Sequence, residues 1–342
     1  MIALEELLRS ADIRPCTPVR DNPEITSLTD NSRKVGPGTL FVAIRGTAVD
    51  AHQFLGQAAE QGAVALVIEH DFDGQLPELP VVCVENTRQA LGRLAHAFHG
   101  HPTREMTCCA VTGSNGKSTV AQLLEAVLKA AGREPALVGT IFVRFGDTVY
   151  PATQTTPGPL TLAAHAAEMR AAGIDALALE VSSHGLDQDR VAGIEFDCAI
   201  LTNVTPEHLD YHGTMADYAA AKKRLFDQYV AADGWRVINL DDPTGREWVG
   251  DRRNNGRAAP ELVGKTLTYG RADDADVRLL SASATLAGIE LVIAARDQQL
   301  ELHSPLKGAF NISNLLAAAA GGLALGFTPG QIRHGLESVA AV

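Results

Sequence analysis

An apolar segment, a glycine-containing turn and an amphipathic segment follow one another between residues 107 and 128. The apolar segment 107–112 reads as a buried strand, and the segment after the turn has apolar residues at helical spacing. These residues are Val120, Leu123, Leu124, Val127 and Leu128. A tight turn between a strand and a helix gathers backbone N–H groups, and the helix N-terminus adds positive potential. This order of elements predicts a phosphate-binding loop in an α/β domain.

The residue types of the turn indicate a nucleotide as the ligand. They are Gly113, Ser114, Asn115, Gly116, Lys117, Ser118 and Thr119. In such a loop the lysine reaches the β- and γ-phosphates, and the hydroxyl that follows it can bind Mg²⁺. Val111 stands where the general pattern has glycine. The alternative is a glycine turn whose helix happens to carry a lysine, but the flanking elements and the Lys-Ser pair favour nucleotide binding.

The same alternation of strand and helix continues along the chain. Apolar strands are expected at 176–181, 197–202 and 236–240, with helical stretches such as 159–172 between them. This pattern predicts a doubly wound, mostly parallel sheet that binds ligands at the carboxyl ends of its strands. Residues 261–305 read as a small antiparallel β addition, followed by a helix from about 311 and a second helix with Thr328 at its N-cap.

Residues 1–102 read as a separate small α/β domain. A short helix is expected at the N-terminus, strands at 39–44 and 63–68, and helices at 52–62 and 88–98. His101-Pro102-Thr103 is a plausible boundary, which makes 103–342 the central nucleotide-binding domain.

Composition excludes several classes of protein. Hydrophobic residues make up 46% of the chain, which suits a folded protein with an ample core. The formal net charge of −12 disfavours nucleic acid, which needs a broad positive surface. The 5 cysteines show neither metal spacing nor a disulfide framework. No signal-peptide pattern and no membrane-spanning apolar run is visible, so we expect a cytoplasmic protein without membrane insertion.

Three further residue types follow predicted strands or lie on a predicted helix. Glu180 ends a buried strand and is a candidate Mg²⁺ ligand, with a capping or salt-bridged glutamate as the alternative. His208 and His212 are four residues apart, as zinc ligands on a helix are, but they lack a third soft ligand and could be surface histidines. Lys222 follows three alanines on a helix, and its spacing alone favours a solvated lysine.

Taken together, the motifs resemble those of the Mur ligases. The phosphate loop, Glu180-Val181-Ser182-Ser183-His184-Gly185-Leu186-Asp187-Gln188 and the run Gly308 to Leu315 carry this resemblance. His208-Leu209-Asp210-Tyr211-His212-Gly213-Thr214-Met215, with Ala220-Ala221-Lys222, is most similar to the tripeptide synthetase branch. Asn31-Ser32-Arg33 and the run Pro37 to Ala43 resemble the family's UDP-binding domain, so the likeness spans nearly the whole chain.

The resemblance implies an ATP- and Mg²⁺-dependent ligase of peptidoglycan precursor synthesis, in the cytoplasm and monomeric. Such an enzyme adds a diamino acid, meso-diaminopimelate or L-lysine, to UDP-N-acetylmuramoyl-L-alanyl-D-glutamate through an acyl phosphate. Gly113 to Thr119 would hold the triphosphate, and Asn311 would read the adenine. The metal ligands would be Ser118, Glu180, His208 and Lys222, the last as a CO₂-derived carbamate. The catalytic residues would be Lys117, Glu180, His208 and Lys222.

The residues implied to contact the UDP-linked substrate lie in both domains. They are Ser32, Thr47, Ala48, Gln154, Thr155, Thr156, Ser182, Gln188 and Arg190. Gln154 stands where asparagine is expected before the paired threonines, and Thr205-Pro206-Glu207 replaces a more usual Ser-Arg-Asp. Neither change removes a catalytic group.

Members of the family continue into a third domain, and this sequence ends where the linker to it is expected. We therefore expect binding to be retained in part and ligation by this chain to be poor. Two alternatives remain open: another ligase of the superfamily, such as a sister Mur ligase or folylpolyglutamate synthase, and a non-catalytic two-domain binding or regulatory protein.

Overall fold

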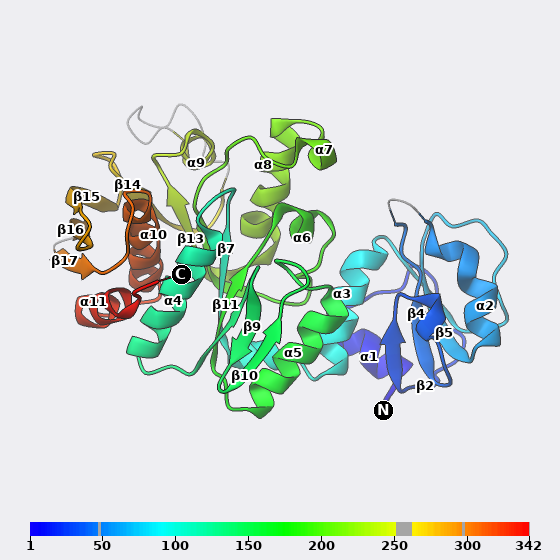
Figure 1. Cartoon of the computed structure of the whole chain (residues 1–342). Helices are drawn as coiled ribbons and strands as arrows, with labels where there is room; N and C mark the ends of the chain where they lie inside the picture. Colours follow the sequence, from blue (N-terminus) through cyan, green and yellow to red (C-terminus); the bar gives the residue numbers. More distant parts are fainter. Residues whose placement is uncertain (47–48, 251–261, 296–297, 342) are drawn as a thin grey trace. The chain divides into compact units, whose positions relative to one another are not determined.

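The computed structural model describes residues 1–46, 49–250, 262–295 and 298–341, which form two compact units (Figure 1). Unit 1 consists of Met1–Thr103, Gly158–Glu168 and Gln188–Ile194, and unit 2 of Arg104–Pro157, Met169–Asp187 and Glu195–Val342. The division therefore differs from the single cut expected at 102/103. The two later segments join unit 1 because Leu160 packs against its core and Gly92 lies against Ala192.

Unit 1 is a parallel sheet with helices on both faces. Its strands, in order, are β3 (Ser27–Thr29), β4 (Thr39–Val42), β5 (Ala63–Glu69) and β6 (Val81–Val84). Residues alternate along β5, so that Ala65 and Val67 belong to one core and Leu66 and Ile68 to another. The first core contains α1 (Leu4–Ser10) and α3 (Thr87–Phe98), and the second contains α2 (Leu55–Glu60).

Short elements complete this unit. They are an antiparallel pair, β1 (Ile2–Ala3) and β2 (Glu24–Ile25), and the 3₁₀ turns η1 (Ser32–Lys34), η2 (Ala51–Phe54) and, at the boundary, η3 (Pro102–Glu105). Asn86 caps α3 by accepting hydrogen bonds from the amides of Arg88 and Gln89 at 2.9 and 3.1 Å. The helices and strands expected for residues 1–102 are thus present with slightly shifted ends, and η2 and α2 together take the place of the helix expected at 52–62.

Unit 2 is built on an 11-stranded sheet in the order β10-β9-β8-β11-β7-β12-β13-β14-β15-β16-β17. Its parallel part consists of β8 (Pro135–Val138), β11 (Ala176–Glu180), β7 (Thr107–Thr112), β12 (Phe196–Leu201), β13 (Val230–Asn239), β14 (Lys265–Gly270) and β15 (Val277–Ala284). Antiparallel strands lie at both edges: β9 (Phe142–Phe145) and β10 (Thr148–Pro151), and β16 (Ile289–Ala295) and β17 (Gln298–Ser304). The predicted doubly wound, mostly parallel sheet is confirmed.

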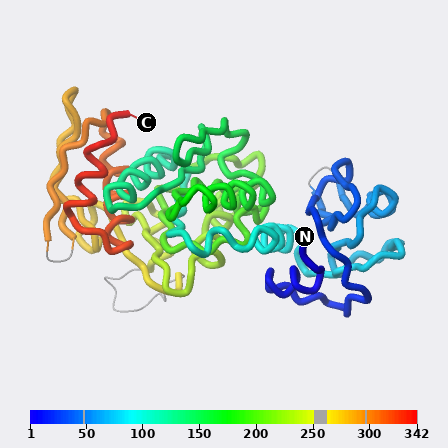
Figure 2. Tube along the Cα trace, turned by 90° about the horizontal axis from the view of Figure 1, so that it is seen from below, coloured from blue at the N-terminus to red at the C-terminus, as the bar shows by residue number. Residues whose placement is uncertain are grey.

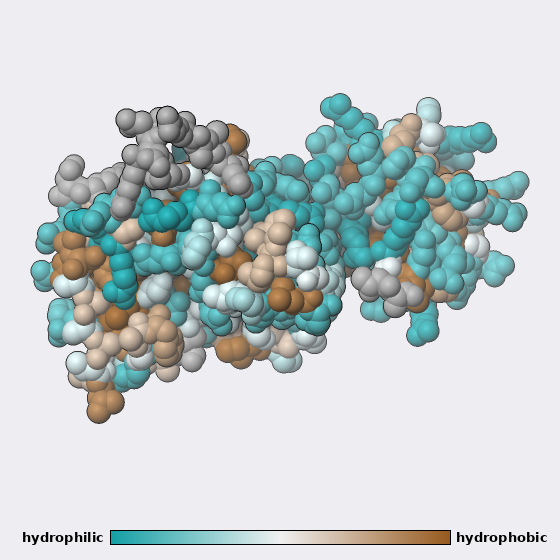
Figure 3. Space-filling view, turned by 90° about the horizontal axis from the view of Figure 1, so that it is seen from above, coloured by the Kyte–Doolittle hydropathy of each residue, from teal (hydrophilic) through white to brown (hydrophobic). Residues whose placement is uncertain are grey.

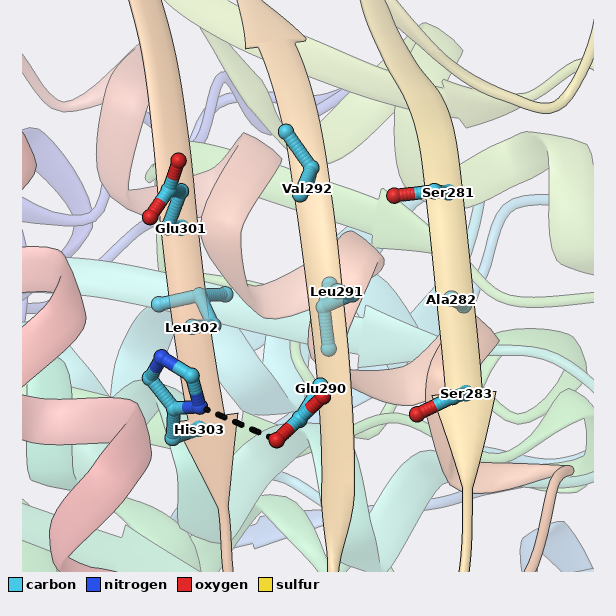
Figure 4. Close-up of a pocket in the computed structure, with 9 residues that line it drawn as sticks. All are labelled: Ser281, Ala282, Ser283, Glu290, Leu291, Val292, Glu301, Leu302 and His303. Atoms are coloured by element: carbon cyan, nitrogen blue, oxygen red, sulfur yellow. Dashed lines mark ion pairs between the residues drawn. The ribbon is translucent and has the colours of Figure 1, made fainter.

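The expected antiparallel addition at 261–305 is only partly right. Strand β14 pairs in parallel with β13, and β15 pairs in parallel with β14, so antiparallel pairing begins only between β15 and β16. Tyr269 explains why β14 belongs to the main sheet, since its side chain is buried and its hydroxyl donates to the Leu201 carbonyl oxygen at 2.8 Å. On β16 and β17, Glu290 and His303 face each other at 3.7 Å beside a hollow of about 250 Å³ (Figure 4).

Three helices of unit 2 share its largest apolar core: α4 (Lys117–Ala130), α10 (Asn311–Ala324) and α11 (Pro329–Ser338). Glycines allow them to pack closely, because a Cβ at Gly335 would lie 2.6 Å from the Cα of Val127. Thr328 caps α11 as predicted, in a capping box with Gln331. In Figure 2, α10 and α11 run beside the strands β15 to β17.

The remaining helices are α5 (Pro159–Ala171), which crosses from unit 1 into unit 2, and a group that follows β11, β12 and β13. This group contains α6 (Ser183–Asp187), α7 (Leu209–His212), α8 (Met215–Arg224), the π-helical turn η4 (Leu225–Tyr229) and α9 (Pro243–Val249). No helix in the described part of the chain is long and apolar enough to cross a bilayer. The face drawn in Figure 3 is mostly hydrophilic, with hydrophobic residues in small separate groups.

The core of unit 2 allows a direct test of stability. Leu124 lies on α4, is fully buried and faces Gly321 of α10. We therefore expect Leu124→Ala to lower the free energy of unfolding by about 2–5 kcal/mol. Urea titration followed by tryptophan fluorescence measures this, because both tryptophans, Trp235 and Trp248, lie in unit 2. Leu286 is 97% exposed, so Leu286→Ala is the control. Equal losses from the two substitutions would contradict the core described here.

Candidate functional site

The predicted phosphate loop lies at the carboxyl end of β7, the strand that pairs with β11 on one side and β12 on the other. Residues Gly113 to Gly116 connect this strand to α4, whose first residue is Lys117. Gly113 and Gly116 have φ values of +146° and +87°, in the region that favours glycine. A Cβ at Gly113 would collide with the Thr202 hydroxyl, and one at Gly116 with the Asn314 amide oxygen. Both positions therefore require glycine for conformation and for space.

The segment that follows β12 holds the loop in place. The Ser114 amide donates to the Asn203 carbonyl oxygen at 2.8 Å, and the Asn115 amide donates to Asn203 Oδ1 at 2.9 Å. The Thr202 hydroxyl donates to the Asn115 carbonyl oxygen at 2.7 Å. The loop is thus shaped by protein contacts. Asn203 was not among the predicted residues, although its place at a strand end was a usable signal.

Two lysines share one acceptor of this loop. Lys117 Nζ donates to the carbonyl oxygens of Gly113 and Ser114 at 2.8 and 2.7 Å, and Lys222 Nζ donates to that of Gly113 at 3.0 Å. Lys222 is 1% exposed, and burial, reinforced by the charge of Lys117, lowers its pKa to about 7, against an opposing effect of Glu207. Burial also lowers the pKa of Lys117. Burial and the charge of Lys117 both favour the neutral amine of Lys222.

Glu180 lies at the end of β11, as predicted, and is 3% exposed. Its carboxylate accepts hydrogen bonds from the Ser118 hydroxyl at 2.9 Å, the Thr140 amide at 3.0 Å and the Thr140 hydroxyl at 3.0 Å. A Cβ at Gly139 would collide with this carboxylate, so glycine leaves room for it. Thr140 was missed by the sequence motifs. These hydroxyl and carboxylate oxygens are the hard donors that Mg²⁺ prefers.

His208 lies at the N-terminus of α7 with a φ of +55°. Its Nε2 is 3.7 Å from Glu207 Oε1, and its ring packs edge-on against that of His184 with centroids 4.7 Å apart. Of the four predicted metal ligands, only Ser118 and Glu180 are thus in direct contact. No three His, Cys, Asp or Glu side chains of the described residues are grouped as a metal site.

The paired threonines of unit 2 differ in accessibility. The Thr155 hydroxyl lies 3.1 Å from the Thr140 hydroxyl, whereas Thr156 is fully buried. The Thr156 hydroxyl donates to the Glu180 carbonyl oxygen at 3.0 Å and accepts from the Ser182 amide at 3.0 Å. Thr156 therefore holds the segment after β11 in place. Gln154, beside this pair, is exposed.

The other residues predicted to contact the UDP-linked substrate belong to unit 1. Arg190 donates to Gln188 Oε1 through Nε and Nη2 at 3.1 and 2.7 Å. Ser32 is 9% exposed and begins η1. Thr47 and Ala48 lie outside the described residues.

Asn311, the residue predicted to read adenine, begins α10 and is 7% exposed. Its Nδ2 donates to the Lys307 carbonyl oxygen at 2.8 Å, and its Oδ1 accepts from Asn314 Nδ2 at 2.8 Å. Asn314 in turn lies against Gly116 of the loop. The structure therefore connects Asn311 to the phosphate loop through Asn314, a residue that the motifs did not identify.

Two cavities lie elsewhere. One is the hollow beside Glu290 and His303, and the other, of about 780 Å³, is in unit 1 and is lined by His52 and Phe72 among others. Neither is lined by any of the predicted site residues. The chemistry expected from the sequence is instead gathered at the carboxyl ends of β7, β11 and β12, as expected for an α/β sheet.

Comparison with known families agrees with this geometry. Residues 111–322 match the family model described as "Mur ligase middle domain", and residues 24–99 match that described as "Mur ligase family, catalytic domain". The two matches lie on either side of residue 103, and the middle-domain match contains both the loop and Glu180.

Curated relatives carry the name UDP-N-acetylmuramoyl-L-alanyl-D-glutamate–2,6-diaminopimelate ligase. The protein of Geobacillus thermodenitrificans is 39% identical over 326 residues, which cover 94% of this chain and 64% of the relative. That of Geobacter metallireducens is 39% identical over 320 residues, which cover 92% and 60%. The chain thus spans less than two thirds of the length of these relatives.

Solved structures give the same picture for the fold. A structure of a ligase of that same name superposes with a TM-score of 0.82 at 26% identity, covering 100% of this chain and 68% of the other. Folylpolyglutamate synthase of Mycobacterium tuberculosis reaches 0.58 at 18% identity and covers 75% of this chain and 63% of its own, a likeness of fold alone. The family models match both units, and the relatives are 39% identical over more than nine tenths of the chain. The chain therefore belongs to the Mur ligase family.

Proposed function

We propose that this chain is the nucleotide-binding and UDP-substrate-binding part of an ATP-dependent amide ligase of peptidoglycan precursor synthesis. The substrate would be UDP-N-acetylmuramoyl-L-alanyl-D-glutamate, and the added amine would belong to a diamino acid, 2,6-diaminopimelate in the named relatives. The observation that carries the proposal is the hydrogen bond from Ser118 to Glu180, next to the loop whose Gly113 carbonyl oxygen accepts from Lys117.

The proposed reaction has two steps. A carboxylate of the substrate attacks the γ-phosphorus of ATP, so that ADP leaves and an acyl phosphate forms. The amine then attacks the acyl carbon, phosphate leaves with the bonding electrons, and the amine loses a proton to give the amide. The first step brings two anions together, which costs about 4 kcal/mol at 4 Å and an effective dielectric of 20. Lys117 and the N-terminus of α4 would reduce this cost.

The residues around Glu180 fit a magnesium ion. A Mg²⁺ ion supplies charge neutralisation between the phosphates during phosphoryl transfer. Ser118 and Glu180 would hold it, because the Ser118 hydroxyl and the Glu180 carboxylate already contact each other. Thr140 positions the Glu180 carboxylate through two hydrogen bonds. Gly139 leaves room for this carboxylate, because a Cβ there would collide with it.

Lys222 fits a second role, as a carbamate that adds a negative charge to the site. CO₂ reacts only with a neutral amine: the nitrogen lone pair attacks the carbon, and one proton is released. Burial of Lys222 and its low pKa favour that neutral form near pH 7. The carbamate would provide an oxygen ligand for a metal ion, and the family resemblance adds His208, the residue before α7, as a further ligand.

The substrate contacts remain those implied by the family motifs. We propose that Gln154, Thr155, Ser182, Gln188 and Arg190 contact the muramoyl-peptide, and that Ser32 and the Thr47-Ala48 loop contact the uridine diphosphate. Thr156 is assigned a positioning role for this set, because its hydroxyl is already engaged inside the protein. Asn311 is proposed to bind adenine beside the loop.

The carbamate has a direct spectroscopic test. In ¹³C-bicarbonate we expect a carbamate carbonyl signal that disappears in Lys222→Met and persists in Lys223→Met, the control at the neighbouring lysine, whose amine is paired with Asp227. At constant dissolved CO₂ the signal should weaken between about pH 8 and about pH 6, because protonation removes the reactive amine. A signal that survives in Lys222→Met, or grows toward low pH, would show that the carbamate lies elsewhere or is absent.

Calorimetric titration tests the substrate. We expect UDP-N-acetylmuramoyl-L-alanyl-D-glutamate to bind at least about tenfold more tightly than UDP-N-acetylmuramoyl-L-alanine, because its extra carboxylate can pair with Arg190. In Arg190→Lys, which keeps the charge but loses the planar fork, this preference should shrink. Equal binding of the two ligands by the original chain would favour a sister ligase as the correct assignment.

A further inference from the structure

Tyr218 lies among the loop, Glu207 and Lys222, although no sequence motif gave it a role. It is on α8, four residues before Lys222, so the two side chains project from the same face of the helix. Its side chain is fully buried, and burial raises its pKa to about 12. The hydroxyl therefore keeps its proton near pH 7 and can act as both donor and acceptor.

The hydroxyl contacts the loop directly. Tyr218 Oη is 2.9 Å from Ser114 Oγ and 3.2 Å from Glu207 Oε2. Ser114 Oγ is also 3.0 Å from the Thr205 carbonyl oxygen, so its single proton goes either to that oxygen or to the tyrosine. A carboxylate only accepts, so the tyrosine accepts from Ser114 whenever it donates to Glu207. The Thr205 amide donates to the same Ser114 oxygen at 2.9 Å. Ser114 is thus fixed from two sides, by the backbone after β12 and by a side chain of α8.

The ring makes a separate contact. Lys222 Nζ lies over the Tyr218 ring, 4.5 Å from its centroid, while it donates to the Gly113 carbonyl oxygen at 3.0 Å. An aromatic face attracts the positive N–H groups of an amine or ammonium. The Lys222 nitrogen is therefore held between the ring and the loop, so one tyrosine touches both functional elements.

We propose that Tyr218 is a positioning residue that joins the phosphate loop to Lys222, with its hydroxyl fixing Ser114 and its ring fixing the lysine amine. The inference rests on the proposed function, because it takes the loop as the ATP site and Lys222 as the carbamylated residue. Removal of the hydroxyl then releases Ser114 and weakens ATP binding indirectly, and removal of the ring releases the amine.

A double-mutant cycle tests the part played by the hydroxyl. The dissociation constant of ATP with Mg²⁺ is measured by calorimetry for the original chain, Tyr218→Phe, Ser114→Ala and the double variant. We expect Tyr218→Phe to weaken binding about tenfold, as for one hydrogen bond, and by less than about twofold when Ser114 is already alanine. Phenylalanine keeps the buried ring, and thermal unfolding checks that each variant is folded.

The outcomes separate this inference from the proposed function. If the original chain does not bind ATP, both fail together. If the original chain binds ATP and the Tyr218→Phe variant binds it equally well, only the role of Tyr218 is wrong. The same holds if Tyr218→Phe weakens ATP binding by the same factor with serine and with alanine at position 114.

The part played by the ring is tested with the ¹³C carbamate signal. Tyr218→Phe should keep this signal, and Tyr218→Leu, once shown to be folded by thermal unfolding, should lose most of it. Equal signals in the two variants would overturn the role of the ring, whereas absence of the signal in the original chain would count against the carbamate itself.

Discussion

A buried carboxylate at the end of a parallel strand is the constraint on which the site depends. Glu180 is nearly inaccessible, and an ionised carboxylate in such a place is costly unless donors surround it. The donors come from the phosphate loop side through Ser118 and from the end of β8 through Thr140. Satisfying this one group therefore fixes three neighbouring strand ends relative to one another.

The opposite side of the loop is fixed by a second layer of buried polar contacts. Asn239 Nδ2 donates to the Thr202 carbonyl oxygen at 2.6 Å, and the Val204 amide donates to Asp242 Oδ2 at 2.9 Å. The end of β13 thus holds the segment that shapes the loop. Lys222 enters the same region from α8, and its burial next to Lys117 lowers its pKa. The same packing therefore sets both the position of Lys222 and its lowered pKa.

Local patterns in the sequence predicted the parts of the structure that depend on nearby residues. The loop and α4 were predicted because a strand, a glycine turn and helical spacing are contiguous in the chain, and Glu180 because it ends an apolar strand. Lys222 was different, since its spacing alone predicted a solvated lysine and only the family resemblance assigned it a role. Its burial arises from contact with Gly113, more than one hundred residues earlier, which periodicity cannot show.

The same reason explains the residues that were missed. Thr140, Asn203, Asn314 and Tyr218 come from four different segments and share no motif. Only the folded sheet brings Thr140 to Glu180 and the other three to the loop. The assignment of Gly158–Glu168 and Gln188–Ile194 to unit 1 was also missed. It depends on packing of Leu160 against a distant core, whereas the boundary near 103 was visible as a local change in pattern.

We propose that Glu180 and Ser118 form the metal-binding side of an ATP site. The dissociation constant of ATP, measured with Mg²⁺ and again with a chelator for the original chain and for Glu180→Gln, tests this proposal. We expect Mg²⁺ to strengthen ATP binding to the original chain and Glu180→Gln to reduce this gain by about tenfold or more. If Mg²⁺ strengthens ATP binding to both proteins by the same factor, Glu180 is not part of the metal site.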